Sequence, residues 1–286
     1  MKPISDGATT KKLNQRSQLK KIMKNRIKEL FASRKNGILS MYYTGGFPSL
    51  SATVGIAEAL ASAGTDIIEI GIPYSDPVAD GPTIQASNTI ALRNGMRLSK
   101  LLDQVKEIRS KVEIPIILMG YINPVLQYGI EKFVRDASDA GVDGVILPDL
   151  PMDEYIDQYK ALFDSANIIN TFLISPTTSD ERIRKIDAVS DGFIYAVSAS
   201  SITGARGKFE KQQLDYFERL TKMKLRNPYL IGFGISNHET FTTASKYGAG
   251  AIVGSAFVDV LKNSKDLTTD ITQFVKSLKQ NGTSNL

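Results

Sequence analysis

The 286-residue chain has no cysteine and a single histidine, His238. A disulfide framework, a thiolate metal site, a thiol nucleophile and any site that needs two imidazoles are therefore excluded. Long apolar runs are also missing, since stretches such as residues 114–119 and 249–253 are far shorter than the roughly 20 residues that span a bilayer. The sequence thus predicts a soluble protein without a metal site or membrane partner, cytoplasmic by default, although an organelle is also compatible.

Positive charge is concentrated at the N-terminus of a chain whose net charge is +5. Residues 1–35 hold eleven Lys and Arg residues but only two acids, Asp6 and Glu29. Such a segment can bind polyanions, but a solvated tail is the commoner case, and we expect no nucleic-acid partner. It lacks the apolar core of a secretory signal and the Ser and Arg content of a transit peptide. We expect residues 1–24 to be a flexible extension and residues 25–286 to form one catalytic domain.

Beyond residue 36, short β-rich runs alternate with longer segments of helical period, which is typical of parallel strands joined by crossover helices. Eight such units, each about 30 residues long, predict a single (β/α)8 TIM barrel: a closed, parallel, eight-stranded sheet with outer helices. An open doubly wound sheet is the alternative, but no Gly-x-Gly-x-x-Gly follows the first predicted strand. The strands are expected at residues 38–44, 66–73, 114–121, 144–150, 170–175, 193–198, 228–235 and 251–257. The helices are expected at residues 51–62, 98–112, 131–140, 153–164, 180–189, 209–225, 238–247 and 266–279.

An insertion at residues 72–95 interrupts the rhythm directly after the second predicted strand. The C-terminal ends of barrel strands face the active site, so this insertion is interpreted as a functional loop. It carries Asp76 and Asp80 among three prolines, which stiffen it. Asx-type turns are the ordinary explanation for such residues, but a third acid just upstream favours a functional one.

That third acid is Glu69, which alternates with isoleucines in the second predicted strand. A carboxylate facing the helix layer would be buried and unpaired, so a position inside the barrel mouth costs less free energy. Apolar surroundings raise the pKa of a carboxyl group and suit it to general acid/base work. Pairing with a neighbouring cation is the structural alternative.

Glycines after the last strands indicate an anion site. Gly232 and Gly234 follow the seventh predicted strand, and Gly254-Ser255 lies in the eighth, where bare amides are able to approach a phosphate. Close packing at the rim is the alternative for each glycine. Thr203-Gly204 lies in a small, polar loop with the composition of a lid or of a plain surface loop.

A tyrosine lies in the preceding predicted strand. Tyr195 shares a face with Phe193 and Val197. It is either a core residue or a phenol near the pocket.

The run Glu69-Ile-Gly-Ile-Pro-Tyr-Ser-Asp-Pro-Val-Ala-Asp80-Gly-Pro-Thr-Ile-Gln85 closely resembles the signature of the tryptophan synthase alpha subunit family. Matches over more than nine-tenths of the chain support the likeness. They are Thr44-Gly-Gly-Phe-Pro48, Met119-Gly-Tyr-Ile-Asn-Pro124, Pro148-Asp149-Leu-Pro151, Ser175-Pro-Thr177, Thr203-Gly204 and Gly232-Phe-Gly-Ile-Ser236. The resemblance implies an eight-stranded barrel that cleaves indole-3-glycerol phosphate to indole and glyceraldehyde 3-phosphate by a retro-aldol reaction.

The resemblance also implies roles for individual residues. Glu69 matches the acid/base group that protonates indole C3, and Asp80 the carboxylate that holds the indole N–H and stabilises the cationic indolenine. The phosphate-binding set is matched by Gly204, Gly232, Gly234, Gly254 and Ser255. Thr203 matches the lid residue that hydrogen-bonds Asp80 on closure, and Tyr195 a pocket phenol.

A partner is implied in the same way. Pro73, Asp76 and Pro77 match the loop that faces the beta subunit, with which the family forms α2β2 heterotetramers. That subunit holds pyridoxal phosphate and receives indole through a tunnel, whereas the alpha subunit needs no cofactor.

The sequence departs from the family pattern in the lid, where Ser201 replaces a glycine, which changes the conformational freedom of the loop. Two other functions remain open. Another phosphosugar-handling barrel enzyme would carry a catalytic lysine or a Cys/Asp pair at its strand ends, and no lysine lies inside the eight predicted strands. A catalytically idle subunit that only activates a partner would not need both Glu69 and Asp80.

Overall fold

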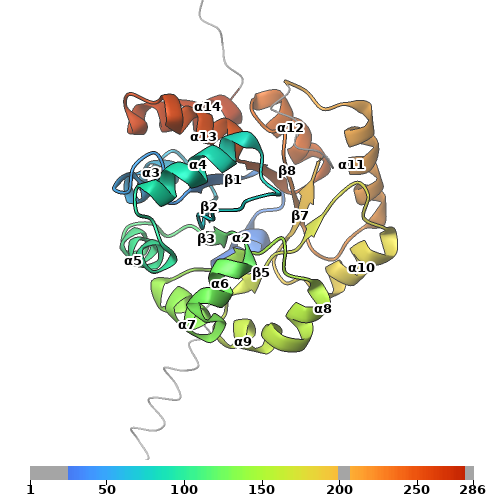
Figure 1. Ribbon diagram of the computed structural model, residues 1–286. Helices are drawn as coiled ribbons and strands as arrows, with labels where there is room; N and C mark the ends of the chain where they lie inside the picture. Colours follow the sequence, from blue (N-terminus) through green and yellow to red (C-terminus); the bar gives the residue numbers. More distant parts are fainter. Residues whose placement is uncertain (1–24, 199–206, 281–286) are drawn as a thin grey trace, which may run out of the picture.

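In the computed structural model, which describes residues 25–198 and 207–280, parallel strands form one sheet surrounded by helices (Figure 1). The spatial order of the strands is β5-β4-β3-β2-β1-β9-β8-β7-β6. Their bounds are β1 Ile38–Thr44, β2 Ile67–Gly71, β3 Ile116–Met119, β4 Gly144–Ile146, β5 Ile169–Asn170, β6 Leu173–Ile174, β7 Ile194–Val197, β8 Tyr229–Gly232 and β9 Gly250–Val253. The predicted TIM-barrel class is confirmed.

The expectation of eight unbroken strands was wrong at the fifth, which is divided into β5 and β6. Its first half pairs with β4, and its second half pairs with β7. Between the halves, the Thr171 amide donates to the Val145 carbonyl, and the Phe172 carbonyl accepts from the Tyr195 amide, each at 2.9 Å. The ring therefore closes through one stretch of chain that changes neighbours, and not through a ladder between β5 and β6.

Helices follow most of the strands and pack around the sheet (Figure 1). Their bounds are α2 Arg26–Ser33, α3 Ala52–Ser62, α4 Pro82–Arg93, α5 Leu98–Arg109, α6 Ile122–Tyr128, α7 Ile130–Ala140, α8 Met152–Glu154, the π-helix η1 Tyr155–Tyr159, α9 Lys160–Ser165, α10 Asp180–Val189, α11 Lys211–Met223, α12 His238–Tyr247, α13 Ser255–Asn263 and α14 Leu267–Lys279. None of the helices in the described ranges is both long and apolar enough to cross a membrane.

Three expectations about the bounds of helices and strands need correction. The insertion at 72–95 is a loop only in its first part, because α4 begins at Pro82, whose fixed φ suits the first helical turn. The helix expected at 153–164 is divided into α8, η1 and α9. The last predicted strand extended to residue 257, but β9 ends at Val253 and α13 begins at Ser255. Apolar residues lie on both sides of Gly254-Ser255, and this hid the boundary.

The N-terminal end of the barrel is plugged by α2. Asn25 caps this helix by accepting the Ile27 amide, and its Nδ2 donates to the Asp143 and Asn167 carbonyls at 2.8 Å. Phe31 stacks on Phe193 of the barrel interior with ring centroids 5.4 Å apart. Since this end is filled by apolar side chains, a ligand site is left to the C-terminal ends of the strands.

Close packing of strands β1 and β9 depends on Gly250. A Cβ atom there would lie 1.9 Å from the Ile38 carbonyl oxygen, so β1 would have to move. We expect Gly250→Ala to lower the free energy of unfolding by about 3 kcal/mol, the upper end of the usual cost of overpacking. Urea denaturation measures the loss.

The matched control is Gly55→Ala in the exposed face of α3, where a Cβ would meet nothing within 4 Å. Removing a helical glycine should instead stabilise the protein by about 0.5–1 kcal/mol. If both variants changed stability alike, close approach of β1 and β9 would not be what requires Gly250.

Candidate active site

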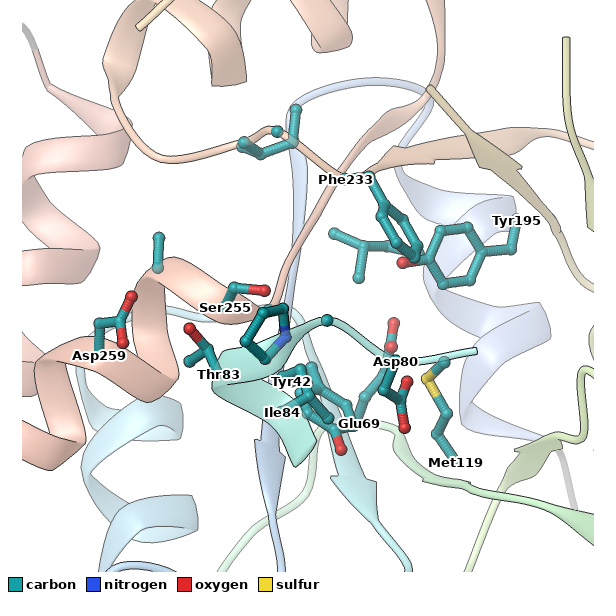
Figure 2. Close-up of a pocket in the computed structure, with 17 residues that line it drawn as sticks. Tyr42, Glu69, Asp80, Thr83, Ile84, Met119, Tyr195, Phe233, Ser255 and Asp259 are labelled. Atoms are coloured by element: carbon teal, nitrogen blue, oxygen red, sulfur yellow. The ribbon is translucent and has the colours of Figure 1, made fainter. Parts of the chain in front are cut away.

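One cavity of about 270 Å³ lies at the C-terminal ends of β1, β2, β7, β8 and β9 (Figure 2). Most of its wall is apolar or aromatic, and a few carboxyl, hydroxyl and backbone groups face it. The lining residues are Tyr42, Glu69, Asp80, Gly81, Pro82, Thr83, Ile84, Met119, Tyr195, Phe233, Gly234, Ile235, Ile252, Gly254, Ser255, Ala256 and Asp259. The structure therefore brings two of the predicted acids, Glu69 and Asp80, to one place with Gly234 and Gly254 of the C-terminal third.

Glu69 lies in the middle of β2, completely buried, beside Tyr42 of β1 in strand register. Its Oε1 accepts a hydrogen bond of 2.6 Å from the Ser40 hydroxyl, whereas its Oε2 is buried without a hydrogen-bond partner in the described chain. Burial raises the pKa of Glu69 to about 7, and the Ser40 hydrogen bond opposes this shift. The group is poised to exchange a proton near neutral pH.

Asp80 reaches the cavity from the loop that precedes α4. The loop is held by the Ala79 amide, which donates to the Tyr121 hydroxyl at 3.0 Å, and by the Gln85 side chain, which donates to the Asp80 carbonyl at 2.9 Å. Partial burial raises the pKa of Asp80 to about 6, against a hydrogen bond from Tyr121. At neutral pH, Asp80 is therefore mostly ionised and able to stabilise a cation.

Two tyrosines fill the space left by glycines on neighbouring strands. A Cβ on Gly71 would lie 2.3 Å from the Tyr42 hydroxyl oxygen, and a Cβ on Gly232 would lie 2.2 Å from the Tyr195 ring. Both tyrosines are buried and line the cavity, and burial raises the pKa of each, so both stay neutral. Gly232 itself is not among the described residues that line the cavity. Because it has no side chain, it leaves space for the Tyr195 ring.

The N-terminus of α13 opens onto the cavity without a side-chain cap. Its N-cap is Gly254, and Ser255 and Ala256 form its first turn beside the cavity. By contrast, α12 is closed by a capping box between Asn237 and Thr240. The first amides of a helix lack intrahelical acceptors and favour negative charge, so α13 offers a site for a phosphate.

The turn after β8 completes this end of the cavity. Phe233 and Gly234 have φ values of +68° and +75°, a conformation that costs a non-glycine residue free energy. The Ser198 hydroxyl fixes the turn by donating to the Phe233 carbonyl at 2.7 Å. The Phe233 ring lies tilted against Tyr195, with centroids 6.3 Å apart, and forms an aromatic wall.

The remaining predicted site residues lie away from the cavity or outside the described ranges. Thr203 and Gly204, with Ser201, fall in residues 199–206 and are not described. In the loop after β2, Pro73 is buried, Pro77 is half-buried and Asp76 is exposed. Pro73 therefore supports the loop from beneath and does not offer a surface.

Some functional candidates were missed by sequence reasoning. Tyr42 and Ser40 occupy a strand that is buried on both faces, so no alternation marked which side chains face inward. Tyr121 belongs to a motif that supported the resemblance, but its contact with the Asp80 loop depends on a neighbouring barrel unit. Val78 is 81% exposed at the tip of that loop. Its apolar type is visible in the sequence, but its exposure is not.

A TIM barrel with two carboxyl groups of raised pKa, an apolar slot and an uncapped helix N-terminus at one mouth is an acid–base enzyme for a phosphorylated substrate with an apolar body. The family model described as "Tryptophan synthase alpha chain" matches residues 28–284. The chain belongs to the tryptophan synthase alpha chain family.

Known relatives are similar over nearly their whole lengths. The tryptophan synthase alpha chain of Flavobacterium johnsoniae is 55% identical over 240 residues, which cover 84% of this chain and 94% of the relative. That of Parabacteroides distasonis is 51% identical over 256 residues, which cover 90% and 100%. The crystal structure of tryptophan synthase subunit alpha from Legionella pneumophila superimposes with a TM-score of 0.80 at 33% identity, covering 90% of this chain and 98% of that one.

Membership establishes the activity. The chain is a carbon–carbon lyase of tryptophan biosynthesis and catalyses the alpha reaction, the cleavage of indole-3-glycerol phosphate to indole and glyceraldehyde 3-phosphate.

Proposed function

We propose that Glu69 and Asp80 carry out this cleavage as a pair. The observation that carries the proposal is that both carboxyl groups line one apolar cavity, where burial raises the pKa of each. Glu69, with a pKa of about 7, remains protonated in part of the population at neutral pH and serves as the donor. Asp80, with a pKa of about 6, is mostly ionised and serves as the anion.

The chemistry requires both groups. Transfer of a proton from Glu69 to indole C3 breaks the aromaticity of the pyrrole ring and leaves an indolenine cation, whose N–H is held by the Asp80 carboxylate. The bond between C3 and the glycerol side chain then breaks, and its electrons restore the indole ring. The side-chain hydroxyl becomes the aldehyde and returns its proton to the Glu69 carboxylate, so the enzyme ends as it began.

The rest of the cavity positions the substrate. Tyr42, Ile84, Met119 and Phe233 supply apolar surface for the indole ring, and Tyr195 lies beside Glu69. The amides of α13 with Gly234 hold the phosphate, while Gly232 acts by admitting Tyr195. Thr203 stays the proposed lid contact, and Gly204 a proposed member of the phosphate-binding set.

The reaction as written needs only proton transfers, so we propose that the chain works without a cofactor or metal. In the described ranges, no group of three or more His, Asp or Glu side chains could hold a metal ion. Indole release should therefore be unchanged after dialysis against a chelator and without pyridoxal phosphate.

The partner proposed for the chain is a tryptophan synthase beta subunit, in an α2β2 heterotetramer in the cytoplasm. An alpha chain is by name one of several chains, and solved relatives include whole tryptophan synthase from Mycobacterium tuberculosis. Exposed Asp76 and Val78, with half-buried Pro77, give the loop after β2 a surface for docking. Pyridoxal phosphate would belong to the partner.

A direct test mixes the purified chain with indole-3-glycerol phosphate, with and without a beta subunit, and follows indole. We expect slow release by the chain alone and faster release with the partner. No indole under either condition, from a folded protein, would contradict the proposal.

The phosphate site has its own test in Gly254→Asp. An aspartate at this N-cap should satisfy the first amides of α13 and repel phosphate, which raises KM at least about 10-fold while stabilising the helix by about 1 kcal/mol. Steady-state kinetics and thermal unfolding measure the two effects. Ser51→Asp at the exposed N-cap of α3 adds the same charge away from the cavity and should leave KM unchanged. An unchanged KM in Gly254→Asp would place the phosphate elsewhere.

A further inference from the structure

The barrel interior contains a hydroxyl group in an otherwise aliphatic layer. Ser40 of β1 pairs in register with Ile67 of β2 and Ile252 of β9, both of which belong to the interior apolar cluster. Ser40 is completely buried, and a buried hydroxyl without a partner costs free energy. Its hydrogen bond in the structure goes to Glu69 Oε1 at 2.6 Å, a short, charge-assisted distance.

This contact makes the two oxygens of Glu69 unequal. Oε1 is occupied by the Ser40 hydroxyl, while Oε2 is buried and has no hydrogen-bond partner within the described residues. Glu69 also lines the cavity, so the oxygen without a partner is the one available to a bound substrate.

We propose that Ser40 is a positioning residue that selects which oxygen of Glu69 carries the acid proton. Because the Ser40 hydroxyl donates to Oε1, the proton of the neutral acid resides on Oε2. When the substrate binds, the Oε2–H bond breaks as the new C–H bond forms at indole C3, and Oε2 later takes the proton of the departing side-chain hydroxyl. The inference rests on the proposed role of Glu69.

The other ionisable groups around Glu69 do not offer an alternative target for the Ser40 hydroxyl. Tyr42 and Tyr195 are neutral because burial raises the pKa of both. Asp80 and Asp259 are the other acids that line the cavity in the described part of the chain. Asp80 takes its hydrogen bond from Tyr121, and the Ser40 hydroxyl donates to Glu69 and to neither of these acids. Loss of the Ser40 hydroxyl should thus act on Glu69 alone.

The experiment compares Ser40→Ala with wild-type enzyme in steady-state kinetics across pH. We expect kcat to fall about 10-fold, as for the loss of a hydrogen bond to a charged group, with KM within about twofold. The basic limb of the rate profile should move to higher pH, because the lost hydrogen bond favoured ionised Glu69. Ser40→Thr keeps the hydroxyl and should restore both values.

Ile67→Val is the matched control. It removes a methyl group from the register neighbour of Ser40 and leaves the Glu69 hydrogen bond intact, so the limb should not move. If the role of Ser40 were purely structural, Ser40→Ala would behave like Ile67→Val: its stability would fall, and the basic limb of its rate profile would not move. That result would overturn the inference.

Two further variants keep the outcome decisive. If Ser40→Ala does not fold, Ser40→Cys preserves the volume with a weaker donor and should show a smaller shift in the same direction; an unmoved limb would again overturn the inference. Full activity in Glu69→Gln would show that Glu69 is not the proton donor, and the proposed function itself would fail. An inactive Glu69→Gln with a normal Ser40→Ala would remove only the inference about Ser40.

Discussion

Glu69→Gln should lower kcat for indole release by about 10³-fold or more, within the range that a general acid supplies. The amide has nearly the shape of the carboxyl group and can still accept from Ser40, but it has no proton of suitable acidity to give to indole C3. Substrate affinity should change little, because the cavity walls and the phosphate cradle are intact. Rapid-quench or absorbance assays of indole, with equilibrium binding of substrate, separate the two effects.

Glu58→Gln is the matched control, since Glu58 bonds Lys111 on the outer surface of the barrel. It should leave kcat unchanged. If Glu69→Gln retained more than about a tenth of wild-type activity, another group would have to be the donor.

Glu69→Gln should also change the stability of the folded protein in a pH-dependent way. The pKa of Glu69 is raised to about 7 in the folded protein from its ordinary value of 4.5, so the folded state binds the proton more tightly. Folding is therefore penalised increasingly as pH rises from about 4.5 to about 7, and the penalty is absent below that window. Relative to wild type, the free energy of unfolding of Glu69→Gln should be higher by on the order of 3 kcal/mol at pH 8 and little changed at pH 4.

Asp80→Asn should lower kcat by about 10²-fold to 10³-fold, the usual effect of losing one electrostatic contact to a transition state. Asparagine still reaches the indole N–H but no longer opposes the positive charge of the indolenine. KM should rise less than kcat falls, because the charge develops only during the reaction. Steady-state kinetics of the isolated chain measure both constants.

The pH profile gives this prediction a second readout. Activity needs Glu69 protonated and Asp80 ionised, so the rate should fall above pH about 7 and below pH about 6. Asp80→Asn should abolish the acid limb and keep the basic one. Asp76→Asn, an exposed acid of the same loop, should leave the profile of the isolated chain intact; a loss of binding alone in Asp80→Asn would contradict charge stabilisation.

Much of the fold could be predicted because local patterns agree with tertiary structure. β1, α10 and α12 begin and end at the expected residues, since a buried β-rich run and well-capped helical periods mark them. Other boundaries depend on neighbours. The break at Thr171 reflects a change of pairing partner, which a single sequence does not record. The start of α13 is hidden because apolar residues lie on both sides of Gly254-Ser255.

The site was predictable where its residues are close in sequence. Glu69 and Asp80 lie in one motif, and their residue types indicate acid/base work. Ser40 and Phe233 could not be recognised, because the first depends on register between β1 and β2 and the second on a left-handed turn after β8. Gly232 was assigned to phosphate from its position, but its visible contact is with Tyr195.

The most direct measurement is a crystal structure of Glu69→Gln with indole-3-glycerol phosphate, because the variant should bind the substrate without cleaving it. We predict the indole ring between Tyr42 and Phe233, its N–H on Asp80, C3 facing residue 69, and the phosphate on the amides at the start of α13. A substrate bound with C3 turned away from residue 69, or with its phosphate remote from Gly254 and Ser255, would contradict the account.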